Sequence, residues 1–420
     1  MSDRRKSILI AGGGVIGLCV AYYASRRGHE VTLIDRGTAQ SDRCSNGNAG
    51  MVVPSHFVPL AAPASLRAGL AMMRDPRSPL YIQPTLSWDL LTWGWHFWRA
   101  ANTARVAKAA PALRDLHLAS LAAYERLVSE FGNQFGLTQN GLLMLCRTEK
   151  ALHEEAEVAS LAHGLGMPAE VLDREQTAAK EPGVEMNVAG SVYFPKDSHV
   201  SPDRLMDFLR ARVEQAGVRL IWNAQLEGWR TDGSRVIEAR TSRGGFEAEE
   251  FVLCAGVWSS AMGRTLGLGL PMQAGKGYSL TLPEPKQLPK ACAILTEARV
   301  AVTPMGQALR FGGTMEIAGM DESINARRVQ QIVRSASEYY PQFAPGDFEG
   351  VAAWRGLRPC SPDGMPYIGR TRKYGNVVVA TGHGMMGVSL GPITGELVAA
   401  TVSGELIGFD LKLLDPDRYG

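Results

Sequence analysis

The sequence lacks the features that mark several classes of protein. Its six cysteines, at positions 19, 44, 146, 254, 292 and 360, form no C-x-x-C pair. This argues against a zinc site or a disulfide framework and suits a reducing cytoplasm. No run reaches the roughly 18 apolar residues of a membrane span, and Gly12 interrupts the N-terminal apolar stretch too early for a signal peptide. We expect a cytoplasmic protein, peripheral at most at the inner face of the cytoplasmic membrane.

A strong charge of either sign is also missing. The formal net charge is +2 over 420 residues, so nucleic acid is not an expected partner. Hydrophobic residues make up 45% and charged residues 20% of the chain, as in an ordinary globular protein. The length is sufficient for two domains and a large core.

What the sequence does contain is a βαβ unit at its start. The apolar run 8–10 predicts a buried strand, and Gly12-x-Gly14-x-x-Gly17 follows directly. A helix with an apolar face comes next, and a second strand, 31–34, ends on Asp35. This order of strand, glycine turn, helix, strand and acid is typical of dinucleotide binding.

Each residue of this unit has a physical role. Gly12 allows the tight turn, Gly14 lets the backbone approach a pyrophosphate, and Gly17 lets the helix pack closely on the strand. The helix N-terminus offers free N–H groups and a positive dipole end to phosphates. Asp35 can accept hydrogen bonds from ribose hydroxyls.

Other small-residue segments favour a long cofactor. The Gly-rich loop 44–54 follows the βαβ unit, and residues 255–258 form another strand–glycine–helix junction. Leu226 lies where a third strand could meet an adenine. Residues 381–390 form a second glycine-rich turn at the far end of the chain. Two such turns can bind the two halves of one cofactor, which indicates FAD more than NAD.

Residues 57–135 differ from both ends of the chain. Proline-rich connectors separate helical stretches there, of which 113–131 is the clearest. Trp88, Trp93, Trp95 and Trp98 crowd one short stretch. We favour a helix packed into a second domain, and the alternative is an amphipathic surface that touches a membrane or a redox partner.

Four segments carry a resemblance to a known family. They are Ser45-Asn-Gly-Asn-Ala-Gly50, Lys276-Gly-Tyr-Ser-Leu-Thr281, Gly356-Leu-Arg-Pro359 with Pro362-Asp-Gly364, and Thr381-Gly-His-Gly384. Together they resemble the D-amino-acid oxidase/dehydrogenase (DAO) flavoproteins, which include glycine and sarcosine oxidases. The similarity covers nearly the whole chain and is greatest to bacterial D-amino-acid dehydrogenases.

The resemblance implies an α/β fold of the DAO/glutathione-reductase type. A Rossmann-like FAD-binding domain would comprise residues 1–56, 197–270 and 345–420. A second, α+β substrate domain would be built on a mixed or antiparallel sheet from residues 57–196 and 271–344.

The resemblance also implies that the cofactor is FAD and assigns residues to it. Some relatives link the flavin covalently through Cys or His, and neither stands here around 304–306 or at Ser45, so we expect noncovalent FAD. The expected cofactor-binding residues are Gly12, Gly14, Val15, Ile16, Gly17, Asp35, Arg36, Cys44, Ser45, Asn48, Ala49, Gly50, Met51, Leu226, Ala255, Gly256, Trp258, Gly382, His383, Gly384, Met385, Met386, Gly387, Val388 and Ser389.

Two residues are expected in catalysis. Arg358 matches the family arginine that binds the substrate carboxylate, and a planar guanidinium suits that role. Tyr278 resembles the family's active-site tyrosine only loosely, so a packed aromatic is an equal alternative. Met385 occupies the place of a further arginine in glycine oxidase, and any second carboxylate contact must come from elsewhere.

The implied reaction is oxidation of the C–N bond of a D-amino acid, with D-proline or hydroxy-D-proline among the candidates. Hydride would pass to the flavin, the imine would give a 2-oxo acid, and the electrons would go to a quinone or a protein acceptor. The alternatives are a glycine- or sarcosine-type oxidase that uses oxygen, an NAD-dependent dehydrogenase, and a flavin-bearing subunit of a multicomponent dehydrogenase.

Overall fold

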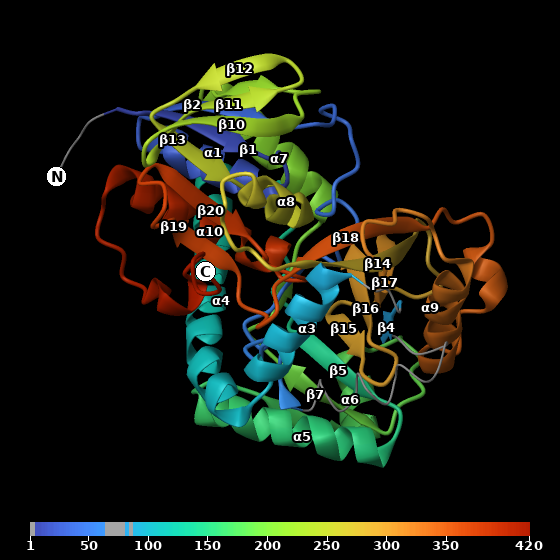
Figure 1. Ribbon diagram of the computed structural model, residues 1–420. Helices are drawn as coiled ribbons and strands as arrows, with labels where there is room; N and C mark the ends of the chain where they lie inside the picture. Colours follow the sequence, from blue (N-terminus) through green and yellow to red (C-terminus); the bar gives the residue numbers. More distant parts are fainter. Residues whose placement is uncertain (1–4, 64–79, 84–86) are drawn as a thin grey trace.

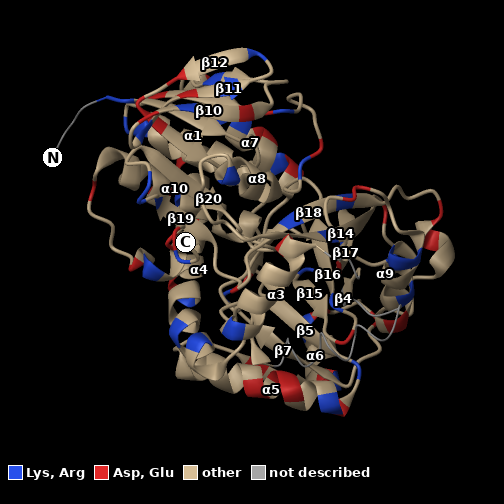
Figure 2. Ribbon diagram, viewed as in Figure 1, with Lys and Arg blue, Asp and Glu red and all other residues tan. Residues whose placement is uncertain are grey.

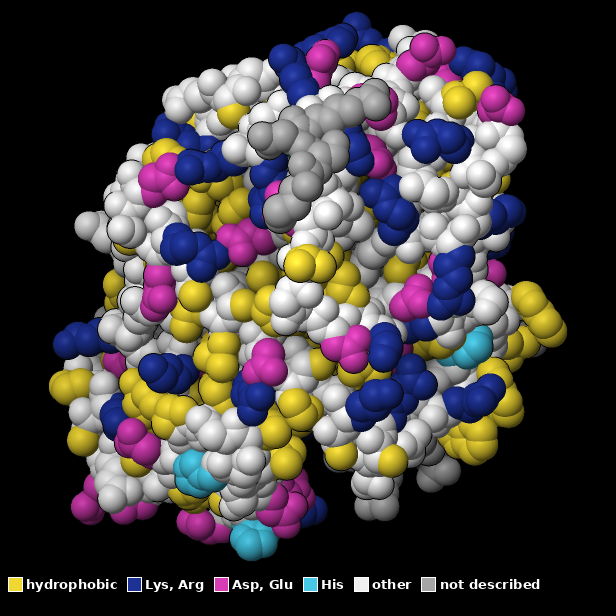
Figure 3. Space-filling view, turned by 90° about the vertical axis from the view of Figure 1, so that its left-hand side faces the viewer, with side chains coloured by type: hydrophobic (Ala, Val, Ile, Leu, Met, Phe, Trp, Pro, Cys, Tyr) yellow, Lys and Arg dark blue, Asp and Glu magenta, His cyan; other side chains and the backbone are white. Residues whose placement is uncertain are grey.

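The structure is a computed structural model that describes residues 5–63, 80–83 and 87–420. Two large sheets dominate it, and Figure 1 shows them on opposite sides of the molecule, with the two glycine-rich ends of the chain meeting in the first. The surface mixes charges of both signs with small hydrophobic patches (Figure 3). This agrees with the small net charge of +2.

The first sheet is a six-stranded Rossmann-like sheet in the order β19-β20-β13-β1-β2-β9. All neighbours are parallel except the edge strand β19, which is antiparallel to β20. The strands are β1 (Ser7–Ala11), β2 (Glu30–Ile34), β9 (Arg219–Ile221), β13 (Glu250–Leu253), β19 (Tyr367–Arg370) and β20 (Val377–Thr381). The chain thus contributes three distant segments to one sheet.

The central strands are apolar because both faces of this sheet are covered. Every residue of β13 and β20 is buried, which is the pattern of a parallel strand between two layers. The helix α1 (Val15–Arg26) packs beside α7 (Pro202–Gln215) and α10 (Gly387–Ser403). A three-stranded antiparallel sheet adds β10 (Leu226–Asp232), β11 (Arg235–Thr241) and β12 (Gly244–Glu247).

The second sheet has nine strands within the described residues and is mixed, as expected for the substrate domain. The strand β15 is parallel to β5 and β17 is parallel to β4, and the other pairs are antiparallel. In spatial order the strands are β18 (Trp354–Cys360), β14 (Gln273–Leu282), β17 (Ala308–Ile317), β16 (Val300–Met305), β15 (Cys292–Leu295), β5 (Leu142–Cys146), β7 (Gly190–Phe194) and β6 (Glu170–Asp173), with β4 (Leu80–Ile82) beside β17.

The predicted domain limits and the sheets differ at one point. The strand β18 pairs with β14 in the second sheet, whereas the predicted limit at residue 345 assigns it to the FAD-binding domain. Strand pairing depends on residues about 80 positions apart, so local sequence cannot place it. The division into domains stays a prediction.

The helices extend or refine the predicted ones. The structure has α3 (Trp88–Ala100), α4 (Thr103–Phe131), α5 (Glu149–Gly164), α6 (Arg174–Lys180), α8 (Ser259–Arg264) and α9 (Ala326–Tyr339). The helix α4 begins ten residues before the predicted Leu113, because the Asn102 side chain caps it and Pro111 is accommodated inside it. Acidic residues gather on the outer surface of α5 (Figure 2).

The tryptophan-rich stretch forms α3, and its two faces differ. Trp93 is 4% exposed and donates its ring N–H to the Cys360 carbonyl at 2.9 Å. Trp88, Trp95 and Trp98 are 81%, 55% and 56% exposed. The helix is therefore packed on one face, as favoured, and presents aromatic rings on the other. No helix in the described ranges is long and apolar enough to cross a membrane.

Candidate active site

The glycine turn after β1 is built for close approach. Gly12 has φ +116°, and a Cβ there would collide with the Cys254 carbonyl of the neighbouring strand. A Cβ on Gly17 would collide with the carbonyl of Gly12. The helix α1 therefore starts directly against the strand ends, and its N-cap residue, Gly14, has no side chain that could cover the helix N-terminus. Such a terminus fits a pyrophosphate.

Asp35 closes this turn from the end of β2. Its carboxylate accepts hydrogen bonds from the backbone N–H of Gly13 at 2.6 Å and of Gly37 at 2.8 Å. The Arg43 guanidinium lies 3.1 Å away. The acid is thus held beside the glycine turn, at the end of β2.

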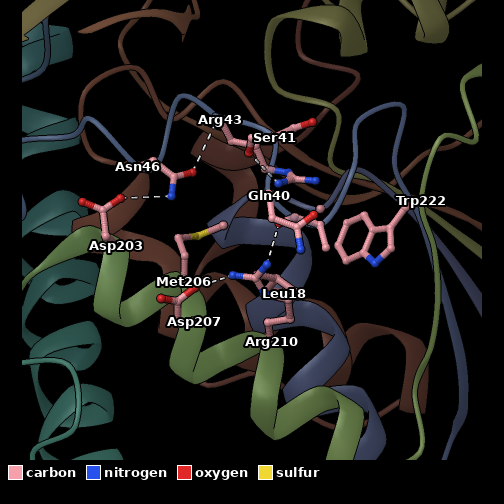
Figure 4. Close-up of a pocket in the computed structure, with 12 residues that line it drawn as sticks. Leu18, Gln40, Ser41, Arg43, Asn46, Asp203, Met206, Asp207, Arg210 and Trp222 are labelled. Carbon is pink, nitrogen blue, oxygen red and sulfur yellow. Dashed lines mark hydrogen bonds and ion pairs between the residues drawn. The ribbon is translucent and has the colours of Figure 1, made fainter. Parts of the chain in front are cut away.

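A crevice of about 190 Å³ lies beside the loop 39–46, which follows Asp35 in the chain (Figure 4). Gly13 and Trp222 form part of its wall, together with the start of α7. The Asn46 side chain donates to Asp203 at 3.1 Å, and the Arg43 backbone N–H donates to the Asn46 side chain at 3.2 Å. The first bond fastens the loop to α7, and the second fixes the Asn46 side chain within the loop.

The loop that follows is fixed from the second sheet by Arg310. This buried guanidinium donates to the carbonyls of Asn46 at 2.7 Å and Asn48 at 2.8 Å, and its other nitrogens bond Thr281 and Asp203. Sequence reasoning missed Arg310. A charged residue inside the otherwise apolar strand 309–311 is the signal that could have found it.

Two further contacts tie the loop to the strands around it. The Ser279 hydroxyl donates to the Gly47 carbonyl at 3.0 Å. The backbone N–H of Val15 donates to the Ser45 hydroxyl at 3.1 Å. The predicted phosphate-binding residues of both segments therefore face each other.

The C-terminal glycine turn joins the same region. The Thr381 hydroxyl donates to the Gly256 carbonyl at 2.9 Å, and Asn48 donates to the Met385 carbonyl at 3.4 Å. The backbone N–H of Gly384 donates to the Pro359 carbonyl at 2.9 Å. Three predicted cofactor segments, around 48, 256 and 382–385, thus converge beside β18.

His383 is fully engaged inside this turn. Its Nε2 lies 3.0 Å from the Thr394 hydroxyl. Burial lowers the pKa of His383 to about 3, so the imidazole is neutral at physiological pH. Its hydrogen bond orients the turn, and it carries no charge there.

Further predicted cofactor-binding residues lie around the end of β2. The Arg36 guanidinium stacks on the Trp258 ring, 3.7 Å from its centroid. Leu226 opens β10, two residues after Ala224, whose N–H donates to the Asp35 carbonyl at 2.8 Å. All of these lie around the end of β2.

Arg358 reaches the site from β18. Its guanidinium lies directly over Gly277 of β14, where any side chain would collide with it. One N–H donates to the Thr314 carbonyl at 2.8 Å. Among the described residues Arg358 pairs with no carboxylate, and burial lowers the pKa of its guanidinium. A half-buried cation without an anion is a ready site for a carboxylate.

The structure places Tyr278 and Arg358 on opposite faces of the second sheet. Successive side chains of a strand point to opposite faces, so Tyr278 faces away from the guanidinium that lies over Gly277. Its ring is buried in the core of the second domain, and its hydroxyl donates to Glu316 at 2.7 Å. Tyr278 is a packed aromatic, which was the other alternative.

A different aromatic ring, that of Trp354, lies on the same face of the sheet as Arg358. Trp354 precedes Arg358 by four residues in β18, on the same face, and its ring covers Gly356 and reaches Gly47 of the loop. Sequence reasoning assigned it no role. Gly356, two residues after Trp354 in the same strand, is the local signal for this ring position, whereas the contact with Gly47 joins residues about 300 positions apart.

These features fit FAD and agree with the comparisons. The chain belongs to the FAD-dependent oxidoreductase (DAO) family, whose model matches residues 7–401. It is 33% identical over 419 residues to a D-amino acid dehydrogenase of Granulibacter bethesdensis, covering 98% of this chain and 99% of that one.

Solved structures agree with the fold. Glycine oxidase from Geobacillus kaustophilus superposes with a TM-score of 0.79 at 26% identity, over 99% of both chains. L-Proline dehydrogenase from P. horikoshii gives a TM-score of 0.74 at 15% identity, over 99% of this chain and 98% of that one. The second likeness concerns the fold alone.

Proposed function

We propose that the protein is an FAD-dependent dehydrogenase that oxidises the C–N bond of D-amino acids. The observation that carries this proposal is the guanidinium of Arg358, which lies over Gly277 without a carboxylate partner among the described residues. The similarity to D-amino acid dehydrogenases over 98% of the chain supports the same substrate class.

In this mechanism Arg358 binds the substrate carboxylate through parallel N–H donors and fixes the orientation of the α-carbon. The Thr314 carbonyl bonds one N–H of Arg358, which limits rotation of the guanidinium. FAD, when bound, supplies the hydride acceptor. Burial of the substrate amine favours its neutral form, from which the C–N bond is oxidised.

We propose that FAD is held without a covalent bond, by the cofactor-binding residues assigned above. Cys44 lies in the Gly-rich loop that would contact the flavin. Burial raises the pKa of Cys44 to about 11, so its thiol stays protonated and is a poor nucleophile at neutral pH. Acid precipitation should leave all yellow colour in the supernatant, and colour in the pellet would contradict this assignment.

The substrate is tested by anaerobic addition of amino acids to the yellow protein. We expect D-amino acids to bleach the flavin absorbance, with D-proline and hydroxy-D-prolines in the same panel. L-Enantiomers should leave it unchanged. Bleaching by glycine or sarcosine with rapid peroxide formation in air would favour the glycine-oxidase type of activity, which the likeness to glycine oxidase keeps as the second candidate.

We propose that the electrons leave to a membrane quinone and that the exposed face of α3 contacts the membrane. Trp88, Leu91, Trp95 and Trp98 lie at helical spacing on that face. Tryptophan is favoured at the membrane interface. No acid occurs between Asp89 and Asp115, and Figure 2 shows Lys and Arg on the neighbouring part of α4. Such a surface suits anionic lipid.

Cosedimentation with vesicles tests this contact. Trp95→Ser/Trp98→Ser should lower the fraction bound to anionic phosphatidylglycerol vesicles about tenfold, because two interfacial rings are lost. The control is Leu406→Ser, an exposed apolar residue outside α3. Equal binding by both variants would refute the membrane contact without touching the proposed reaction.

A further inference from the structure

The helix α4 carries three fully buried polar side chains on one face. His117, Ser120 and Tyr124 follow at spacings of three and four residues, so they lie along a single stripe. All three bond to the first turn of α10, which packs against α4 (Figure 1). Polar groups are expensive to bury unless they are bonded, so this stripe marks a specific connection.

Tyr124 supplies a hydrogen bond that α10 cannot make for itself. In an α-helix the carbonyl of residue 388 would accept the N–H of residue 392, but residue 392 is a proline and has none. The Tyr124 hydroxyl donates to the Val388 carbonyl at 2.7 Å instead. Pro392 and Tyr124 are therefore complementary.

The other two side chains fasten the next residue. The Ser120 hydroxyl donates to the Ser389 carbonyl at 2.6 Å. The Ser389 hydroxyl accepts the backbone N–H of Val53 at 3.1 Å and lies 2.8 Å from His117 Nδ1. Burial lowers the pKa of His117 to about 3, so the ring is neutral and Nδ1 can accept a hydrogen bond from the Ser389 hydroxyl.

We propose that Tyr124, Ser120 and His117 are positioning residues that fix the N-terminal turn of α10 against the flavin. The proposal rests on the assignment of residues 382–389 to the flavin in the proposed function. A helix N-terminus presents free N–H groups and a positive dipole end, which favour negative charge. Because two-electron reduction places negative charge on a flavin, a fixed first turn should stabilise the reduced form.

The decisive variant is Tyr124→Phe, which removes one oxygen and leaves the Val388 carbonyl without its donor. We expect backbone hydrogen exchange in residues 387–391 to accelerate about tenfold. At a fixed ambient potential, the ratio of reduced to oxidised flavin should fall up to tenfold, which corresponds to ~30 mV for a two-electron couple. The matched control is Tyr339→Phe, a buried tyrosine bonded to Glu297 in the second domain.

The double variant Tyr124→Phe/Pro392→Ala provides the rescue. Alanine restores the N–H at position 392, so the Val388 carbonyl regains an intrahelical donor and both readouts should return to within threefold of the wild type. Unchanged exchange and flavin ratio in Tyr124→Phe, or no rescue by Pro392→Ala, would overturn the proposal. A colourless wild-type protein would refute the proposed function instead, while the exchange measurement would still test the connection between α4 and α10.

Discussion

The two faces of the strand β14 carry buried cations that differ in their partners. On one face the Arg358 guanidinium lies over Gly277 and has a backbone carbonyl as its hydrogen-bond partner. On the other face Lys276, 1% exposed, lies 2.5 Å from Asp321 and 3.7 Å from Glu316. Arg358 has no carboxylate partner among the described residues and can bind an incoming anion. Lys276 is paired with the protein's own carboxylates.

This difference separates recognition from stability. A cation paired inside the protein contributes to the fold, and removal of one partner leaves an uncompensated buried charge. A cation without a carboxylate partner in the protein contributes little to the stability of the fold and remains able to bind substrate. The comparison therefore predicts that Arg358 matters for turnover and Lys276 for stability.

The largest expected effect is that of Arg358→Met on turnover. Loss of a buried charge pair with the substrate carboxylate costs about 3–4 kcal/mol, so kcat/KM for D-amino acids should fall roughly 100- to 1000-fold. The flavin content should not change. Arg355→Gln is the control, because Arg355 lies on the opposite face and donates to the Glu322 carbonyl. A loss of less than threefold in Arg358→Met would abolish the comparison.

Lys276→Met should act on stability instead. The buried Glu316 loses its nearby cation, and the free energy of unfolding should fall by about 4 kcal/mol. Urea unfolding measures this change. Lys286→Met serves as the control, since Lys286 is half exposed and its pair with Asp347 should contribute less than about 1 kcal/mol. Equal losses of unfolding free energy in both variants would show that the buried Lys276 pair contributes no more to stability than the exposed Lys286 pair.

Asp197, a buried acid with no cation partner among the described residues, extends the comparison to pH. Burial raises the pKa of Asp197 from 3.8 to about 7, although Ser55 donates to it. The folded state therefore keeps a proton that the unfolded state releases above pH 4, so stability falls as pH rises from about 4 to 7. The wild type should lose about 2–3 kcal/mol between pH 5 and 8 relative to Asp197→Asn. Parallel stability curves of the two proteins would contradict the raised pKa.

Tyr278→Phe should give the smallest effect. Its hydroxyl serves Glu316 on the face away from Arg358, so kcat/KM should stay within about threefold of the wild type while stability falls by about 1 kcal/mol. Steady-state kinetics and urea unfolding on the same preparation distinguish the two. A large loss of turnover at unchanged stability would instead indicate that Tyr278 acts in the active site.

Several parts of the candidate site could be predicted because each consists of a short segment of sequence. The turn after β1, the acid at the end of β2 and the loop from Cys44 to Met51 each occupy a few consecutive residues. The prediction for Arg358 rests on its flanking segment. Arg310 was missed because the carbonyls it bonds belong to residues 262 and 264 positions away. The two alternatives for Tyr278 stayed open because the local sequence of a strand does not say which face meets the cofactor.

The sequence by itself determined the glycine turns, the strand–helix order and the residue types able to bind a dinucleotide, since these depend on local backbone geometry. Only the tertiary structure decided which face of β14 receives Arg358, which three side chains of α4 reach α10, and which tryptophans of α3 stay exposed. Those choices depend on how distant strands and helices pair, and the free energy of that pairing is not carried by any short stretch of the chain.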